Sequence, residues 1–152
     1  MGRWDTGVFD SDSVLDWVGD LCDSGLAKGI AETIVNLEKG LADGYMEMDD
    51  CEISVALAQI VAILHGKPRP RDLPEELADL LDSDRHRSSR NELGRSLHFL
   101  EKALGGNAEI NEDGVWDSPE SLAAWRSHGL TLQKYLKSLQ ESESPKRGCL
   151  WF

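Results

Sequence analysis

Aspartates are the residues near the start of the chain whose type and spacing are most suited to chemistry. Asp5, Asp10, Asp12 and Asp16 fall within sixteen residues, beside the aromatic side chains of Trp4 and Phe9. Clustered carboxylates suit two tasks, the binding of a divalent cation and the docking of a basic partner. A purely structural alternative remains open, in which Asp12 caps a helix and the aromatic residues pack between helices.

Three of the aspartates in this region have the spacing of one helix face. Asp12, Asp16 and Asp20 are four residues apart, so on a helix they form an acidic ridge. Like charges at this spacing destabilise a helix by a few tenths of a kcal/mol per pair, which makes the ridge a candidate docking surface. The predicted partner-binding residues are Asp5, Asp10, Asp12, Asp16 and Asp20; the alternative is a solvated surface with no partner.

A second group of oxygen-bearing side chains lies between residues 109 and 120. The candidate metal ligands are Glu109, Asn111, Asp113, Asp117 and Glu120, which with Gly114 follow the spacing of a calcium-binding loop. The first position holds Glu instead of Asp, Gly105 and Gly106 end the preceding helix too early, and no second loop is visible. The simpler interpretation is an acidic turn before a capped helix.

Side chains typical of catalysis are not arranged in a recognisable pattern. The four histidines are scattered, and no nucleophile motif or phosphate-binding loop is present. Cys22 and Cys51 lie on apolar helix faces, where a buried, unreactive thiol is expected. We therefore expect no enzymatic activity and no cofactor. A modest basic patch is formed by Arg85, His86, Arg87, Arg90 and Arg95. It lacks the interleaved aromatic residues that are typical of nucleic-acid sites. Pairing with acidic residues of the same molecule is at least as good an interpretation of this patch as nucleic-acid binding.

The net charge of the 152 residues is −12, and it is unevenly distributed. Residues 1–66 hold 13 acidic and 3 basic side chains, a net charge of −10. Such a surface repels nucleic acid and anionic lipid and favours a basic protein partner. The longest uncharged run, residues 53–64, is too short for a membrane span. Three widely spaced cysteines and no visible signal peptide predict a cytoplasmic protein.

Apolar residues recur with the helical period throughout, and no strand pattern is found. We predict six helices. The first follows a Ser11 or Asp12 cap and ends at about residue 24, the second covers 26–41, and the third runs from Asp49 and Asp50 to His65. The fourth is short, from Pro74 to Leu81, the fifth covers 91–104, and the sixth starts at Asp117–Glu120 and ends at about residue 140. A loop is expected over 82–89, and Gly129 is a candidate position for a kink. The third helix is apolar almost all round, so it should occupy the centre.

The chain opens with Gly2-x-Trp4-x-x-Gly7-x-Phe9-Asp10-x-Asp12 and continues into Trp17. This opening resembles a family of small bacterial proteins known as domain of unknown function 4259. The resemblance continues at Tyr45-Met46-Glu47 and in a late segment with Asn107, Glu109, Trp116, Trp125 and Arg126, and extends to about residue 140. The residues taken as its structural signature are Gly2, Trp4, Gly7, Phe9, Trp17, Trp116, Trp125 and Arg126. The resemblance implies a bacterial source but no mechanism, because the function of the family is unknown.

Together these observations predict an all-α protein, a compact single-domain bundle of five to six helices over residues 1–140, with a flexible tail over 141–152. Trp4, Phe9 and Trp17 should be mostly buried. The predicted function is that of a non-enzymatic interaction module, of which an inhibitor or immunity-type protein that binds a basic partner is one concrete form. The alternative is a metal-binding protein or metal-dependent hydrolase using Asp5, Asp10, Asp12 and Asp16. The oligomeric state is left open.

Overall fold

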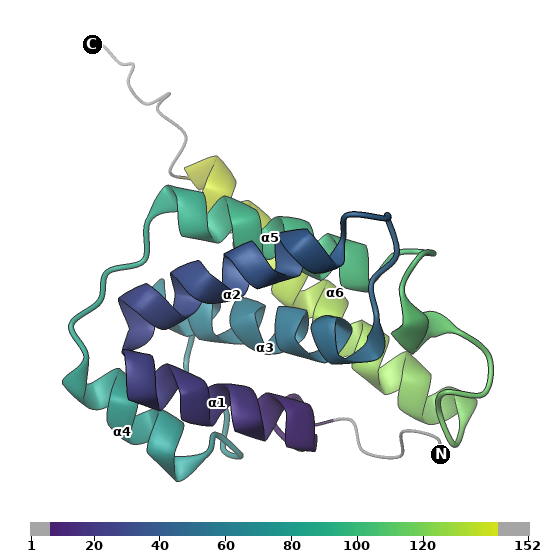
Figure 1. Cartoon of the computed structure of the whole chain (residues 1–152), viewed down its shortest axis with the longest axis horizontal. Helices are drawn as coiled ribbons and strands as arrows, with labels where there is room; N and C mark the ends of the chain where they lie inside the picture. The colour runs from purple at the N-terminus through teal and green to yellow at the C-terminus, as the bar shows by residue number, and fades with distance from the viewer. Residues whose placement is uncertain (1–6, 143–152) are drawn as a thin grey trace, which may run out of the picture.

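Helices account for nearly all regular structure in residues 7–142, which are the residues that the computed structural model describes (Figure 1). The helices are α1 (Asp12–Ser24), α2 (Leu26–Gly40), α3 (Met48–Leu64), α4 (Glu75–Ser83), α5 (Arg90–Ala103) and α6 (Pro119–Ser142), with a short 3-10 helix, η1 (Glu109–Asn111), before α6. The all-α prediction is confirmed.

The central position predicted for the third helix is confirmed as well. α3 contacts α1, α2, α5, α6 and η1, and in Figure 1 it lies between α1 and α2 with α5 and α6 behind. Its residues from Cys51 to Ala62 are buried with the exception of Ile53, which is partly buried. A helix that is apolar all round is stable only when neighbours cover every side, because each exposed apolar face would cost free energy.

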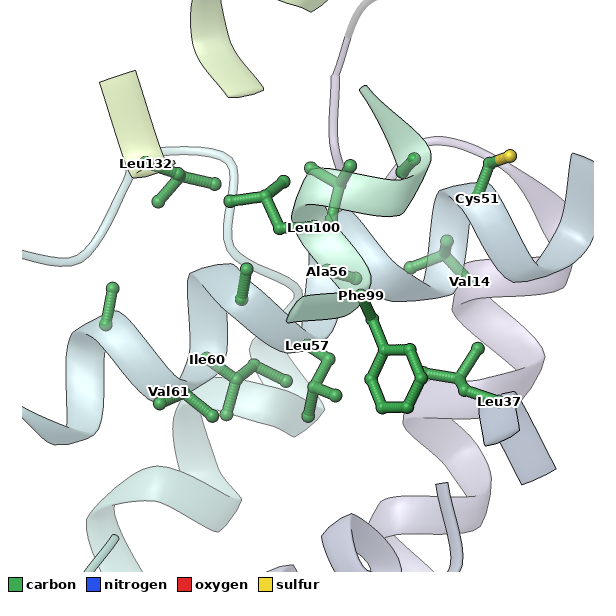
Figure 2. Close-up of a cluster of buried hydrophobic side chains, with 14 of the residues drawn as sticks. Val14, Leu37, Cys51, Ala56, Leu57, Ile60, Val61, Phe99, Leu100 and Leu132 are labelled. Carbon is green, nitrogen blue, oxygen red and sulfur yellow. The ribbon is translucent and has the colours of Figure 1, made fainter. Parts of the chain in front are cut away.

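The other helices each turn one apolar face towards α3. Figure 2 shows this core, in which Val14 of α1, Leu37 of α2, Phe99 of α5 and Leu132 of α6 surround Leu57 and its neighbours on α3. The core therefore spans helices far apart in the sequence. Phe9 and Trp17 are buried in it, as predicted, whereas Trp4 lies outside the described residues.

The helix boundaries follow from local capping. The side chain of Ser11, rather than Asp12, accepts a hydrogen bond from the backbone of Val14 and starts α1. Ser89 starts α5 in the same way, and Ser118 starts α6. Gly25 ends α1 with φ at +88°, a value that favours glycine, and so permits α2 to begin at once.

Three predicted boundaries differ in the structure. α3 begins at Met48, and α4 continues to Ser83, two residues into the predicted loop. α6 continues through Glu141 and Ser142, where a flexible tail was predicted; residues 143–152 lie outside the described part. The sixth helix is unbroken across Gly129, the position at which a kink was considered in the sequence. Gly129 is buried against the side chain of Leu104, and its lack of a side chain permits close helix packing.

Candidate docking surface

The acidic ridge of Asp12, Asp16 and Asp20 lies on the exposed side of α1. The opposite side of this helix is held in the core by Val14, Trp17, Val18 and Leu21. Trp17 also donates a buried hydrogen bond of 2.8 Å from its indole nitrogen to the hydroxyl oxygen of Thr33 on α2. The ridge is therefore presented by a helix that is fixed in rotation by both packing and a hydrogen bond.

Acidic residues of α3 extend this surface. The hydroxyl of Ser13 donates a 2.8 Å hydrogen bond to the carboxylate of Asp49, which brings the first turn of α3 beside the first turn of α1. Burial raises the pKa of the neighbouring Asp50 carboxyl above its usual value, and the charges of Glu47 and Asp49 raise it further. The charges of these neighbouring carboxylates thus act in the same direction as burial on Asp50.

Asp10 is exposed, and its backbone also helps to form the turn before α1. Its backbone nitrogen donates to the carbonyl of Gly7 at 3.4 Å, closing a turn before α1. A Cβ atom at position 7 would come too close to the Asp10 carboxylate, so this exposed side chain would have to move if residue 7 were not glycine. The structure thus places Asp10, Asp12, Asp16 and Asp20 on exposed positions along one segment, and Asp5 lies outside the described residues.

The basic patch is partly neutralised within the molecule. Arg95 forms an ion pair with Glu38 of α2, so part of the acidic half does have an intramolecular partner. His86 lies 2.8 Å from the carboxylate of Glu92. In the described part of the chain, no ion pair involves Asp12, Asp16 or Asp20.

The five candidate calcium ligands are not gathered around one point. The carboxylate of Glu109 accepts a 2.8 Å hydrogen bond from the backbone nitrogen of Met48, and so caps α3. Asn111 donates to the carbonyls of Ala103 and Gly105 at 2.8 Å each. The remaining three, Asp113, Asp117 and Glu120, are exposed. Within residues 7–142, no group of three or more His, Cys, Asp or Glu side chains is placed to hold a metal ion.

Most of the late signature residues form one structural network at this end of the bundle. Arg126 donates from one guanidinium nitrogen to the Leu104 carbonyl at 3.0 Å and to the Asn111 side-chain oxygen at 2.9 Å. The indole nitrogen of Trp116 donates to the carbonyl of Ile110, and its ring lies 6.0 Å from that of Trp125. Arg126 therefore satisfies the carbonyl end of α5, which stabilises the end of this helix.

A connection that the sequence did not reveal joins two loops across this network. Met46 and Ala108 form an isolated parallel bridge, in which the Met46 nitrogen donates to Asn107 and the Glu109 nitrogen donates to Met46, both at 2.9 Å. Nearby, the Tyr45 hydroxyl donates to the Glu112 carboxylate, and this hydrogen bond raises the pKa of Tyr45 well above its usual range. No local pattern could have predicted these long-range pairs.

From Gly7 onward, the opening motif with its buried Phe9 and Trp17 has a defined place in the fold, and so does the network around Trp116, Trp125 and Arg126. A family model described as domain of unknown function (DUF4259) matches residues 2–128. The chain belongs to this family. The match is shorter at its end than the resemblance predicted, because it stops within α6 at residue 128. Neither the curated proteins nor the solved structures include a match to the chain.

An α-helix needs about 20 predominantly apolar residues to cross a membrane. Among the helices of residues 7–142, none has the length and apolar character needed to cross a membrane.

Proposed function

We propose that this DUF4259 member is a non-enzymatic interaction module that binds a basic protein partner through its acidic N-terminal half. A bacterial inhibitor or immunity-type protein is the concrete form of this proposal. The observation that carries it is the exposed ridge of Asp12, Asp16 and Asp20, which forms no ion pair within the described chain. The negative charge of the protein is also concentrated in this half, because residues 1–66 carry −10 of the total net charge of −12.

Electrostatic attraction from such a surface acts mainly on the rate of association. Concentrated charge steers an oppositely charged partner during diffusion, and charges at the rim of an interface influence the rate more than the final affinity. Leu15, which is 38% exposed beside the ridge on α1, offers apolar contact area once the partner has docked. The same negative surface disfavours nucleic acid as the partner.

The properties of the cysteines support a role without covalent catalysis. Burial raises the pKa of the Cys51 thiol to about 12, so this group is protonated at neutral pH and is not a nucleophile. Cys22 and Cys51 are both free thiols, which suits the reducing cytoplasm in which we place the protein. The competing function, metal-dependent hydrolysis, makes a different prediction: metal would remain bound at a stoichiometric level in protein purified without chelator.

The proposal is tested by the kinetics of partner binding. After a partner is identified by cross-linking in native cells, association rates are measured at several salt concentrations for the wild type and for the double variant Asp16→Asn/Asp20→Asn. A matched control, Asp113→Asn/Asp117→Asn, removes the same charge from exposed positions outside the N-terminal half.

We expect the ridge variant to associate more slowly, with the largest difference at low salt, because the Debye length is about 10 Å at 0.1 M. The control variant should associate at nearly the wild-type rate. Equal rates and equal salt dependence for all three proteins would show that the ridge is only a solvated surface.

A further inference from the structure

Large apolar side chains are exposed at three places in residues 7–142. They are Leu15 on α1, Val35 on α2 and Leu130 on α6, with exposed fractions of 38%, 47% and 47%. A single exposed apolar residue is ordinary on a protein surface, so the neighbours of each one decide what it can bind. Leu15 lies beside the acidic ridge, whereas the charged neighbours of Leu130 are basic.

Leu130 lies in an open groove along the exposed face of α6, which we call the α6 groove. It is lined by Ala123, Arg126, Ser127, Leu130, Thr131 and Lys134. Arg126 and Lys134 lie one turn before and one turn after Leu130, and the other lining side chains are small. Such a groove suits a helix that presents an apolar side chain between negative charges, because both the shape and the charge are then complementary.

The positive charges of the α6 groove are not neutralised within the described chain. Arg126 donates to the Leu104 carbonyl and to the Asn111 side-chain oxygen, which are neutral groups, so the guanidinium keeps its charge. Lys134 is exposed, and neither Arg126 nor Lys134 belongs to an ion pair among residues 7–142. The groove is therefore positive on a protein whose total charge is −12.

The spacing of the two positive charges matches that of the acidic ridge. Arg126 and Lys134 are eight residues apart on α6. Asp12 and Asp20, the outer residues of the ridge, are also eight residues apart on α1. Eight residues of α-helix span about 12 Å, so each negative charge can face a positive one when the two helices lie along each other.

The exposed leucines fall between these charges on both helices. Leu130 is midway between the two positive charges, and Leu15 lies between Asp12 and Asp16. Gly19, one turn after Leu15, leaves open space at the surface of α1, where a leucine of another helix can pack. The leucines would then be covered by apolar contact at the centre, while the charges around them fix the register.

We propose that the α6 groove of one copy of this chain binds the acidic ridge of a second copy, with Leu130 of the first against Leu15 and Gly19 of the second. α1 packs on α2, α3 and α4, whereas α6 packs on α3 and α5 and crosses behind them in Figure 1. A pair of copies therefore still has one open ridge and one open groove, and further copies add head to tail. This inference rests on the proposed function, because it names a second copy of the chain as a basic partner of the same ridge.

The total charge sets the conditions for this association. Each copy carries −12, so two copies repel one another at low ionic strength. At an ionic strength of about 0.15 M the Debye length is about 8 Å, so distant charges are screened while charges in contact still attract. One helix face forms a small interface, and the association is therefore weak.

Sedimentation equilibrium of the purified full chain tests the proposal. At about 0.15 M ionic strength and up to about 1 mM protein, we expect the average mass to rise steadily with concentration and not to stop at two copies. A monomer throughout this range, or a closed dimer, would overturn the proposal.

Two variants each disable one face. Asp12→Lys/Asp20→Lys places like charges against the groove, and Leu130→Asp places a charge against an apolar side chain. Each should weaken self-association at least about tenfold. Val35→Asp is the matched control, because Val35 is as exposed as Leu130 and acquires the same charge; it should associate like the wild type. An equal loss in the control would overturn the proposal.

Mixing the two disabled variants gives the sharpest result. The ridge variant keeps an intact groove and the groove variant keeps an intact ridge, so an equal mixture should form one-to-one dimers and nothing larger. No association in the mixture, or growth like that of the wild type, would overturn head-to-tail pairing. Circular dichroism checks that the variants are folded. If the ridge variant is not, the comparison of Leu130→Asp with Val35→Asp decides.

Failure of this inference is distinguishable from failure of the proposed function. Leu130→Asp leaves the ridge unchanged, so a different basic protein should bind this variant at the wild-type rate. A wild type that stays monomeric would overturn self-association alone. The proposed function fails instead if ridge substitutions leave the association rate with a different basic protein unchanged.

Discussion

The Glu109 carboxylate and the Met48 backbone nitrogen are joined by a 2.8 Å hydrogen bond across 61 residues of sequence. Met48 is the first residue of α3, whose first backbone N–H groups have no partner within the helix. The side chain of Glu47, directly before the helix, does not cap it. A residue from the segment before α6 therefore caps the central helix of the bundle.

This contact predicts a stability cost for Glu109→Ala. Loss of a helix cap destabilises a protein by about 0.5–2 kcal/mol, and we expect a loss in this range for the free energy of unfolding. Urea unfolding measures it, with Asp113→Ala as the control because Asp113 is exposed four residues further on. Equal stability of the two variants would show that the Glu109 contact contributes nothing to the fold.

The same contact bears on calcium. Two of the five candidate ligands, Glu109 and Asn111, already hydrogen-bond to the protein, so binding would have to break those bonds. We expect millimolar calcium to change neither the melting temperature nor the fluorescence of Trp116, because a ligand that does not bind the native state cannot stabilise it. A saturable increase that Glu120→Gln abolishes would contradict this expectation.

The helical framework was predictable from the sequence because its determinants are local. The spacing of apolar residues defined the face of each helix, and Ser11, Ser89 and Ser118 stand where caps are needed. The burial of Trp17 followed from the same periodicity. The Met46–Ala108 bridge and the Glu109 cap were not predictable, because they depend on which segments the fold brings together.

The candidate sites illustrate the same limit. The exposed face of α1 could be read from the four-residue spacing of its aspartates, whereas the position of Asp49 beside Ser13 could not. One buried polar side chain could have been noticed in the sequence, because Gln59 is a lone amide within an otherwise uncharged apolar run. His128 was one of four scattered histidines, and only the fold shows that it borders the same hollow as Gln59.

The buried hydrogen bond between Trp17 and Thr33 should make their substitutions non-additive. Trp17→Ala should cost about 3–5 kcal/mol, the usual cost of truncating a core aromatic residue. The hydrogen bond itself is tested with Trp17→Phe and Thr33→Val, of which the second leaves a buried indole N–H without its acceptor. The double variant should be less destabilised than the sum of the two. Additive losses in urea unfolding would mean that the bond makes no net contribution.

Asp50 should give the stability of the protein a dependence on pH. Its pKa is raised in the folded state, chiefly by burial, so the folded protein holds this proton more tightly than the unfolded chain. Where the folded state binds more protons, stability falls as pH rises, here from the ordinary value of 3.8 up through the folded pKa.

Asp50→Asn removes this penalty. We expect the variant to unfold at higher urea than the wild type at pH 7, with the difference shrinking to nothing as the pH falls below 3.8. Asp113→Asn, measured beside it, reports the general effect of removing one exposed negative charge. A gain for Asp50→Asn that persists undiminished at low pH would assign the effect to something other than titration.

The acidic ridge makes a prediction about stability that is separate from partner binding. Asp12, Asp16 and Asp20 are exposed and four residues apart on α1, and like charges at this spacing destabilise a helix by a few tenths of a kcal/mol per pair. Asp16→Asn/Asp20→Asn should therefore leave the melting temperature unchanged or slightly raised, with the gain largest at low salt, where repulsion is least screened. Thermal unfolding at two salt concentrations measures this. A clear loss of stability would mean that the aspartates support the fold, and slower association of the same variant with a partner could then no longer be assigned to steering alone.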